Sequence, residues 1–103
     1  MIDERERRAL EKLLFAYILR DETWDGEKYR GRLDDILNWI LDPEDRQTWP
    51  YVAFDMLRGR IEPGFRPFLL ETLGYDEEPK EELWARYGER AREPLERLKE
   101  GRR

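Results

Sequence analysis

The segment Trp49–Leu57 carries large apolar side chains on more than one side of any helix that it can form. At helical spacing, Trp49, Val52 and Met56 share one face, whereas Tyr51 and Phe54 point away from it. Elsewhere in the chain, apolar residues recur as single stripes between charged residues. A helix that is apolar on both sides is buried on both sides, in its own fold or in a partner. We therefore expect the fold to be built around this segment.

The composition around this segment favours helices. Leu, Glu and Arg are abundant, while the β-branched residues comprise one Val, five Ile and three Thr. A length of 103 residues suits one domain, and 13% aromatic residues argue against disorder. The sequence predicts an all-α, compact, single-domain bundle of about five helices, with a central buried helix near residues 49–58.

Apolar periodicity and capping residues place these helices. They are expected at residues 3–20, 28–41, 49–58 and 65–73, and from Pro79 onward. The first helix should have one apolar stripe with Arg, Glu and Lys opposite, and Asp3 as its N-cap. Asp42 and Pro43 should start a short turn of helix. Gly74 predicts a Schellman ending, and Pro94 should kink or end the last helix. The folded domain is expected to span residues 1–99, with a frayed basic tip at 100–103.

Missing residue types exclude several kinds of chemistry. The chain contains no Cys, His or Ser, so it can form neither a disulfide nor a Ser–His or Cys–His triad. Imidazole and thiolate ligands for zinc are also absent. The seven glycines are scattered and form no phosphate-binding loop. We expect no catalytic residues, no cofactor and no metal; a carboxylate-based enzyme is the third-ranked alternative.

The loop that follows the first helix partly matches a calcium-binding loop. Asp21, Thr23, Asp25 and Gly26 occupy positions 1, 3, 5 and 6 of an EF-hand pattern. Position 12, which needs a bidentate carboxylate, is Arg32. A polar turn between helices is therefore the preferred interpretation.

The net charge of −5 bears on location and partners. An acidic protein does not attract nucleic acid or an anionic membrane by its overall field. No apolar run is long enough to span a bilayer, and the charged N-terminal residues 1–8 do not resemble a signal peptide. The sequence thus predicts a cytoplasmic protein without a membrane partner.

Aromatic and Arg residues, which favour interface cores, are plentiful in this chain. The predicted partner-binding residues are Trp24, Trp39, Tyr51, Phe54 and Asp55. Trp39 could instead flank the core, which is the preferred interpretation. Asp55, if buried, must pair with an Arg or carry a raised pKa, and Arg58 and Arg66 are the candidate partners. The leading hypothesis is a non-enzymatic module that binds another protein with a basic surface, as an inhibitor or immunity-type protein does. Self-association into a homodimer is a further option.

Residues 33–76 resemble repressor-type (lambda-repressor-like) helix-turn-helix domains. The resemblance rests on the runs 56–63 (MLRGRIEP) and 68–76 (FLLETLGYD) and covers about forty residues. It implies that residues 33–41 form the first helix of the motif and residues 48–58 the recognition helix. A DNA-binding regulator is therefore the alternative function, with Arg46, Arg58, Arg60 and Arg66 as its nucleic-acid-binding residues. Residues 33–75 hold four Arg against eight acids, which makes nucleic acid the less favoured partner.

Overall fold

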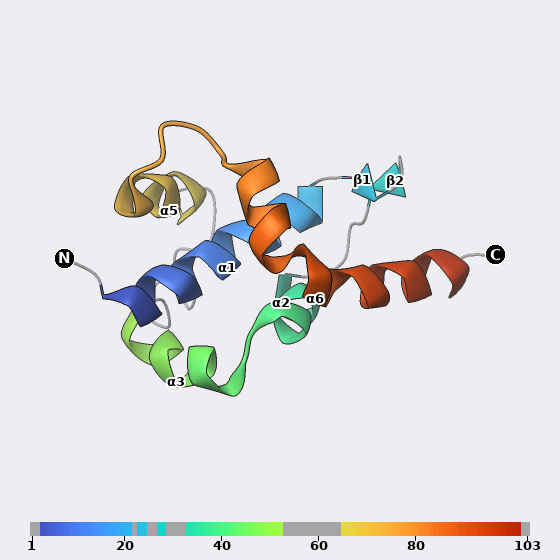
Figure 1. The fold of residues 1–103 in the computed structure, drawn as a ribbon, viewed down its shortest axis with the longest axis horizontal. Coiled ribbons are helices and arrows are strands. Elements are labelled where there is room, and N and C mark those ends of the chain that lie inside the picture. Colours follow the sequence, from blue (N-terminus) through green and yellow to red (C-terminus); the bar gives the residue numbers. More distant parts are fainter. Residues whose placement is uncertain (1–2, 22, 25–26, 29–32, 53–64, 102–103) are drawn as a thin grey trace.

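The computed structural model describes residues 3–21, 23–24, 27–28, 33–52 and 65–101 (Figure 1). Its helices are α1 (Glu4–Asp21), α2 (Leu33–Ile40), α3 (Pro43–Val52), α5 (Phe65–Leu73) and α6 (Lys80–Gly101). Two-residue strands, β1 (Thr23–Trp24) and β2 (Glu27–Lys28), pair antiparallel with Thr23 opposite Lys28. The Cα radius of gyration of 13.5 Å is that of a compact domain of this size. The prediction of an all-α single domain is confirmed.

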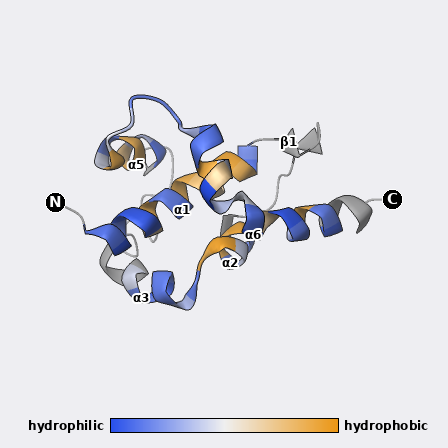
Figure 2. Ribbon diagram, viewed as in Figure 1, coloured by the Kyte–Doolittle hydropathy of each residue, from blue (hydrophilic) through white to orange (hydrophobic). Residues whose placement is uncertain are grey.

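Helix α1 lies at the centre of the described residues. It packs against α2, α3, α5 and α6, and every residue from 9 to 19 is buried. Figure 2 shows apolar residues in the middle of α1 and along α2, which packs against it. The expectation of one apolar stripe with a solvated opposite face is wrong for α1, because neighbours cover it on all sides. Of the segment predicted to be central, residues 49–52 form the end of α3, and residues 53–58 lie outside the described residues.

Capping residues end two helices as the sequence predicts. The Asp3 carboxylate accepts a hydrogen bond from the Glu6 amide at 2.9 Å, which confirms Asp3 as the N-cap of α1. At the end of α5, Gly74 has φ of 82°, and its amide bonds to the Glu71 carbonyl at 3.1 Å. The Tyr75 amide reaches the Leu70 carbonyl at 2.9 Å. These two bonds are the predicted Schellman motif.

Two helix starts differ from those expected, and of the two outcomes expected at Pro94, a kink or an end, the helix does not end there. Helix α2 begins at Leu33 and not at residue 28, with β2 before it. Helix α3 is continuous from Pro43, because Asp42 and Pro43 start a full helix and not a single turn. Helix α6 continues through Pro94 to Gly101, and Figure 1 shows it changing direction along its length. Proline removes one backbone donor and introduces a kink, which the hydrogen bonds of the flanking turns tolerate.

Candidate functional site: a buried charge centre on α1

Two neighbouring residues of α1, Glu11 and Lys12, bring opposite charges into the interior of the domain. Each side chain is only 4% exposed. Successive side chains on a helix point about 100° apart, so these two face different neighbours. Buried charges are costly unless they are paired and hydrogen-bonded. The partners of these two residues therefore define the site.

The Glu11 carboxylate accepts three hydrogen bonds from the far end of the chain. Tyr87 donates its hydroxyl to Oε1 at 2.6 Å, whereas Oε2 receives the Tyr75 hydroxyl at 3.1 Å and Arg86 Nη1 at 2.8 Å. The guanidinium of Arg7 lies one turn away on α1, with Nε 3.6 Å from Oε2. Glu11 thereby joins α1 to α6 and to the residue that follows the Schellman turn.

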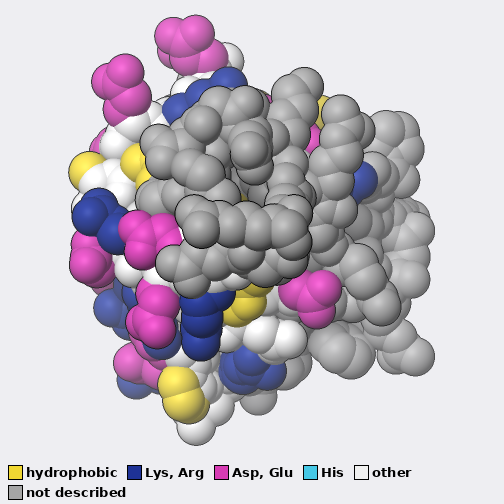
Figure 3. Space-filling model, turned by 90° about the vertical axis from the view of Figure 1, so that its right-hand side faces the viewer, with side chains coloured by type: hydrophobic (Ala, Val, Ile, Leu, Met, Phe, Trp, Pro, Cys, Tyr) yellow, Lys and Arg dark blue, Asp and Glu magenta, His cyan; other side chains and the backbone are white. Residues whose placement is uncertain are grey.

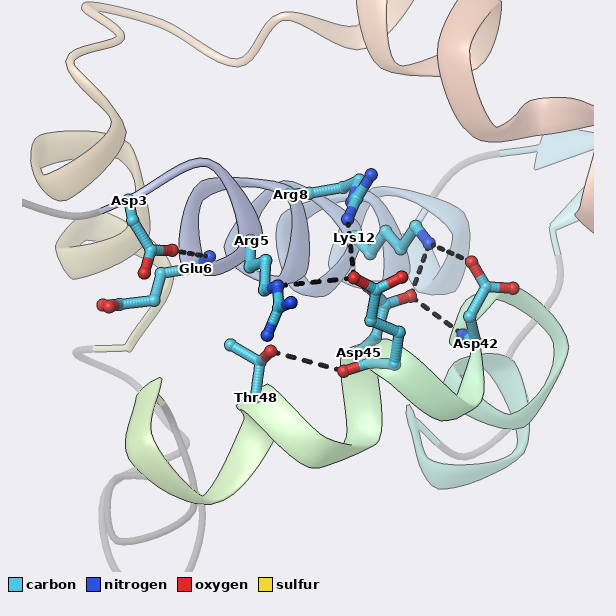
Figure 4. Close-up of polar contacts among 9 residues, drawn as sticks. Asp3, Arg5, Glu6, Arg8, Lys12, Asp42, Asp45 and Thr48 are labelled. Carbon is cyan, nitrogen blue, oxygen red and sulfur yellow. Dashed lines mark hydrogen bonds and ion pairs between the residues drawn. The ribbon is translucent and has the colours of Figure 1, made fainter.

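The Lys12 ammonium points to the start of α3 (Figure 4). Its Nζ lies 2.5 Å from Asp45 Oδ2 and 3.1 Å from Asp42 Oδ2. Asp45 Oδ2 also accepts the Asp42 amide at 2.8 Å, which is the reciprocal bond of a capping box. The N-terminal end of a helix repels a cation, and the two carboxylates offset that repulsion. Asp45 is 3% exposed, so the Lys12–Asp45 pair is buried at both ends.

Helix α6 connects the two halves of this centre. The Tyr87 ring, whose hydroxyl binds Glu11, has its centroid 5.6 Å from Lys12 Nζ. One turn further along α6, Arg90 forms an ion pair with Asp42. We call the connected set Glu11, Lys12, Asp42, Asp45, Tyr75, Arg86, Tyr87 and Arg90 the charge centre. It holds α3 and α6 to the same point on α1.

The electrostatics of the charge centre favour fixed protonation states. Burial, reinforced by the Glu11 carboxylate, raises the pKa of both Tyr75 and Tyr87 above the ordinary value of 10.0. Hydrogen bonding to Glu11 raises the pKa of Arg86 above its ordinary range. A general acid or base works best with a pKa near the working pH. These shifts move the pKa of both tyrosines further above neutral pH. The geometry suits the positioning of helices better than proton transfer.

The structure describes some of the predicted partner-binding residues with their side chains, some by their backbones alone, and others not at all. Trp39, on α2, is half-buried and packs against the core, as the preferred core-flank interpretation predicts. Trp24 lies in β1 and Tyr51 in α3, and only their backbones are described. Phe54 and Asp55 lie outside the described residues, so their role stays a prediction.

The residues predicted to bind nucleic acid divide in the same way. Arg46 is exposed on α3 and donates a hydrogen bond to Asn38 Oδ1 at 2.7 Å. Arg66, on α5, forms ion pairs with Asp21 and, at 2.5 Å, with Glu78. Arg58 and Arg60 lie outside the described residues, as does Asp55, the ion-pair partner that the sequence suggested for Arg58 or Arg66.

Sequence reasoning missed the charge centre. Glu11 and Lys12 stand between Leu10 and Leu13, where a helix with one apolar stripe turns its polar side to water. The one available signal was the Asp42–Asp45 run, whose capping pattern marks a helix start. Nothing local to that run points to a lysine 33 residues earlier in the chain.

The described residues contain no group of three or more acidic side chains placed to hold a metal ion. None of the described helices has the length and apolar character needed to cross a membrane. Comparison with protein-family models, with curated proteins and with solved structures finds no match to this chain.

Proposed function

We propose that this chain is a non-enzymatic, acidic, helical protein-interaction module whose partner presents a basic surface. A module that inhibits its partner, or protects a cell from it as an immunity-type protein does, belongs to this class. The proposal rests on how the charges of the described residues are distributed between internal pairs and solvent.

Most of the basic side chains that the structure describes form ion pairs within the domain, and this observation carries the proposal. Ion pairs with acids of the same chain engage Arg5, Arg7, Arg8, Lys12, Arg66, Arg86, Arg90 and Arg92. Figure 3 shows acidic and basic side chains lying next to one another on the described part of one face. By contrast, Asp35, Glu71, Asp76 and Glu77 are exposed, and none pairs with another described residue. An approaching protein therefore meets carboxylates that are available for pairing, which favours a basic partner.

Helix α2 offers a described place for such contact. Asp35 is exposed and Trp39, one turn later on the same side of α2, is half-buried. We call these two residues the Asp35–Trp39 surface. An Arg or Lys of a partner can pair with Asp35 while it lies against the accessible part of the indole, an arrangement that cation–π attraction favours. Tryptophan at such a position is a frequent binding hot spot.

Affinity capture followed by titration tests this function. Wild type, Asp35→Lys/Trp39→Ala and Phe54→Asp would be used as bait in a lysate of the source organism. Glu93→Lys serves as the control, since it makes the same charge reversal on the exposed face of α6. A captured protein is then purified and titrated against each variant at low and high salt.

We expect the Asp35→Lys/Trp39→Ala variant to bind at least tenfold more weakly than the control, since truncating a hot spot costs about 2 kcal/mol. Wild-type affinity should fall as salt rises, because exposed charges are screened. If this variant and the control bound the partner with equal affinity, the Asp35–Trp39 surface would not be part of the interface. If the wild-type affinity did not change with salt, the hypothesis that the partner presents a basic surface would be wrong.

The alternative function is a helix-turn-helix DNA-binding regulator, and the order of α2 and α3 bears on it. Helices α2 and α3 follow each other closely, with Leu41 and Asp42 between them, although α3 begins at Pro43 and not at residue 48 as the resemblance implies. The discriminating measurement is retention on duplex DNA at low salt, where phosphate contacts are strongest. Absence of retention would end this alternative.

A further inference from the structure

The start of α3 contacts one more polar group than helix capping requires, the ammonium of Lys12 on α1. Asp45 already satisfies the Asp42 amide, as the third residue of a capping box does. Yet Lys12 adds a third, buried group to it, and the Lys12–Asp45 pair is 4% and 3% exposed at its two ends. Buried ion pairs are often no more stabilising than apolar residues of similar volume, because both charges lose their hydration. The pair therefore calls for a role other than stability.

We propose that Lys12 is a positioning residue that selects one placement of α3 on α1. An apolar contact between two helices tolerates sliding and rotation, since dispersion and burial are non-directional. A buried ammonium does not tolerate them, because a placement of α3 that moves Asp45 away takes from Lys12 its closest and most buried carboxylate partner. Lys12 thus penalises every alternative placement of α3 more than it favours the observed one.

Two neighbouring contacts make the selection stricter. Lys12 itself is held from the side of α6, since the Tyr87 ring lies 5.6 Å from its Nζ and the Tyr87 hydroxyl is bound to Glu11. Asp42 also pairs with Arg90, but these two side chains are 45% and 46% exposed, so that contact restrains Asp42 only weakly. The contacts of Tyr87 therefore hold the ammonium from the side of α6, independently of α3. By contrast, the ion pairs of Glu44 with Arg5 and Arg8 join side chains that are 42–66% exposed, and such contacts adapt easily.

The consequence for recognition rests on the proposed function. Helix α3 contains Tyr51, one of the predicted partner-binding residues. If α3 without the pair spends about a tenth of its time in the wild-type placement, the apparent affinity for the partner falls about tenfold. The positioning role itself does not depend on that partner and can be tested without it.

The test measures the distance between α1 and α3 in a variant that lacks both charges. Lys12→Met/Asp45→Asn removes the pair and leaves an amide oxygen to accept the Asp42 N–H. Because the sequence contains no cysteine, Glu4→Cys and Gln47→Cys give two unique spin-label sites, both exposed, one on each helix. The matched control is Glu89→Gln/Arg92→Met, which removes an exposed pair of α6 with a 3.7 Å separation.

We expect one narrow distance distribution in wild type and control, and a broad or multiple one in Lys12→Met/Asp45→Asn at unchanged helical circular dichroism. Asp45→Asn alone, in which Lys12 keeps Asp42, should broaden the distribution less and serves if the double variant does not fold. If Lys12→Met/Asp45→Asn folded and kept the narrow distance distribution of wild type, the proposal would be overturned. Broadening without a change in partner affinity would support positioning by Lys12 and contradict only the role of α3 in binding.

Discussion

Replacing Glu11 with Gln tests whether the charge centre stabilises the domain through the charge of that carboxylate. The substitution keeps the size of the side chain, which is 4% exposed, but neutralises it. Three hydrogen bonds, from Tyr75, Tyr87 and Arg86, then lose an ionised acceptor. A hydrogen bond to a charged group contributes about 1 kcal/mol more than a neutral one, so we expect a loss of about 3 kcal/mol. That is a large part of the roughly 5–15 kcal/mol that stabilises a domain.

The assay is equilibrium urea denaturation followed by circular dichroism, with thermal unfolding as a second measure. Glu82→Gln is the control, because Glu82 also binds Arg86, at 2.5 Å, but is 47% exposed. Exposed pairs contribute about 0–1 kcal/mol, so this variant should unfold close to wild type. If Glu11→Gln lost no more stability than Glu82→Gln, the buried carboxylate would not be the centre of the network, and our reasoning would be refuted.

Three further predictions concern the same region. First, the raised pKa values of Tyr75 and Tyr87 add stability that is fully present below the ordinary value of 10.0 and is lost as pH rises through the folded-state values. The free energy of unfolding should therefore fall above that pH, and a Tyr87→Phe variant titrated with urea should show a shallower fall. Second, Gly88→Ala should destabilise the domain by about 1–2 kcal/mol in spite of better helix propensity, because the new Cβ would stand 2.6 Å from the Trp84 ring; a higher melting temperature would contradict this. Third, Gly74→Ala should cost about 1–2 kcal/mol in urea titration, since φ is +82° and the only penalty is conformational, with no atom within 4 Å of the new Cβ. Gly74→Asn should lose less, and equal losses would argue against a backbone origin.

Signals that act within a few residues were reliable guides to the fold. The Asp3 cap, the Schellman ending at Gly74 and the bounds of α5 follow from local hydrogen bonding and backbone conformation. Boundaries were less reliable where local signals compete. Pro94 marks a kink or a stop equally well, and only the packing of the flanking turns, with Leu95 4% exposed, shows that α6 continues.

The sequence by itself determined that the chain is helical, that it forms one domain, and where α1 and α5 begin and end. It did so because propensity, periodicity and capping are properties of neighbouring residues. Only the tertiary structure decided that α1 is the central helix and that Glu11 and Lys12 are buried. Their partners outside α1 lie 30 to 76 residues away in the chain, and a helical stripe does not reveal how many neighbours will cover its polar side. A charged residue on such a helix is solvated or buried according to those distant partners, because only they can replace the water that it loses.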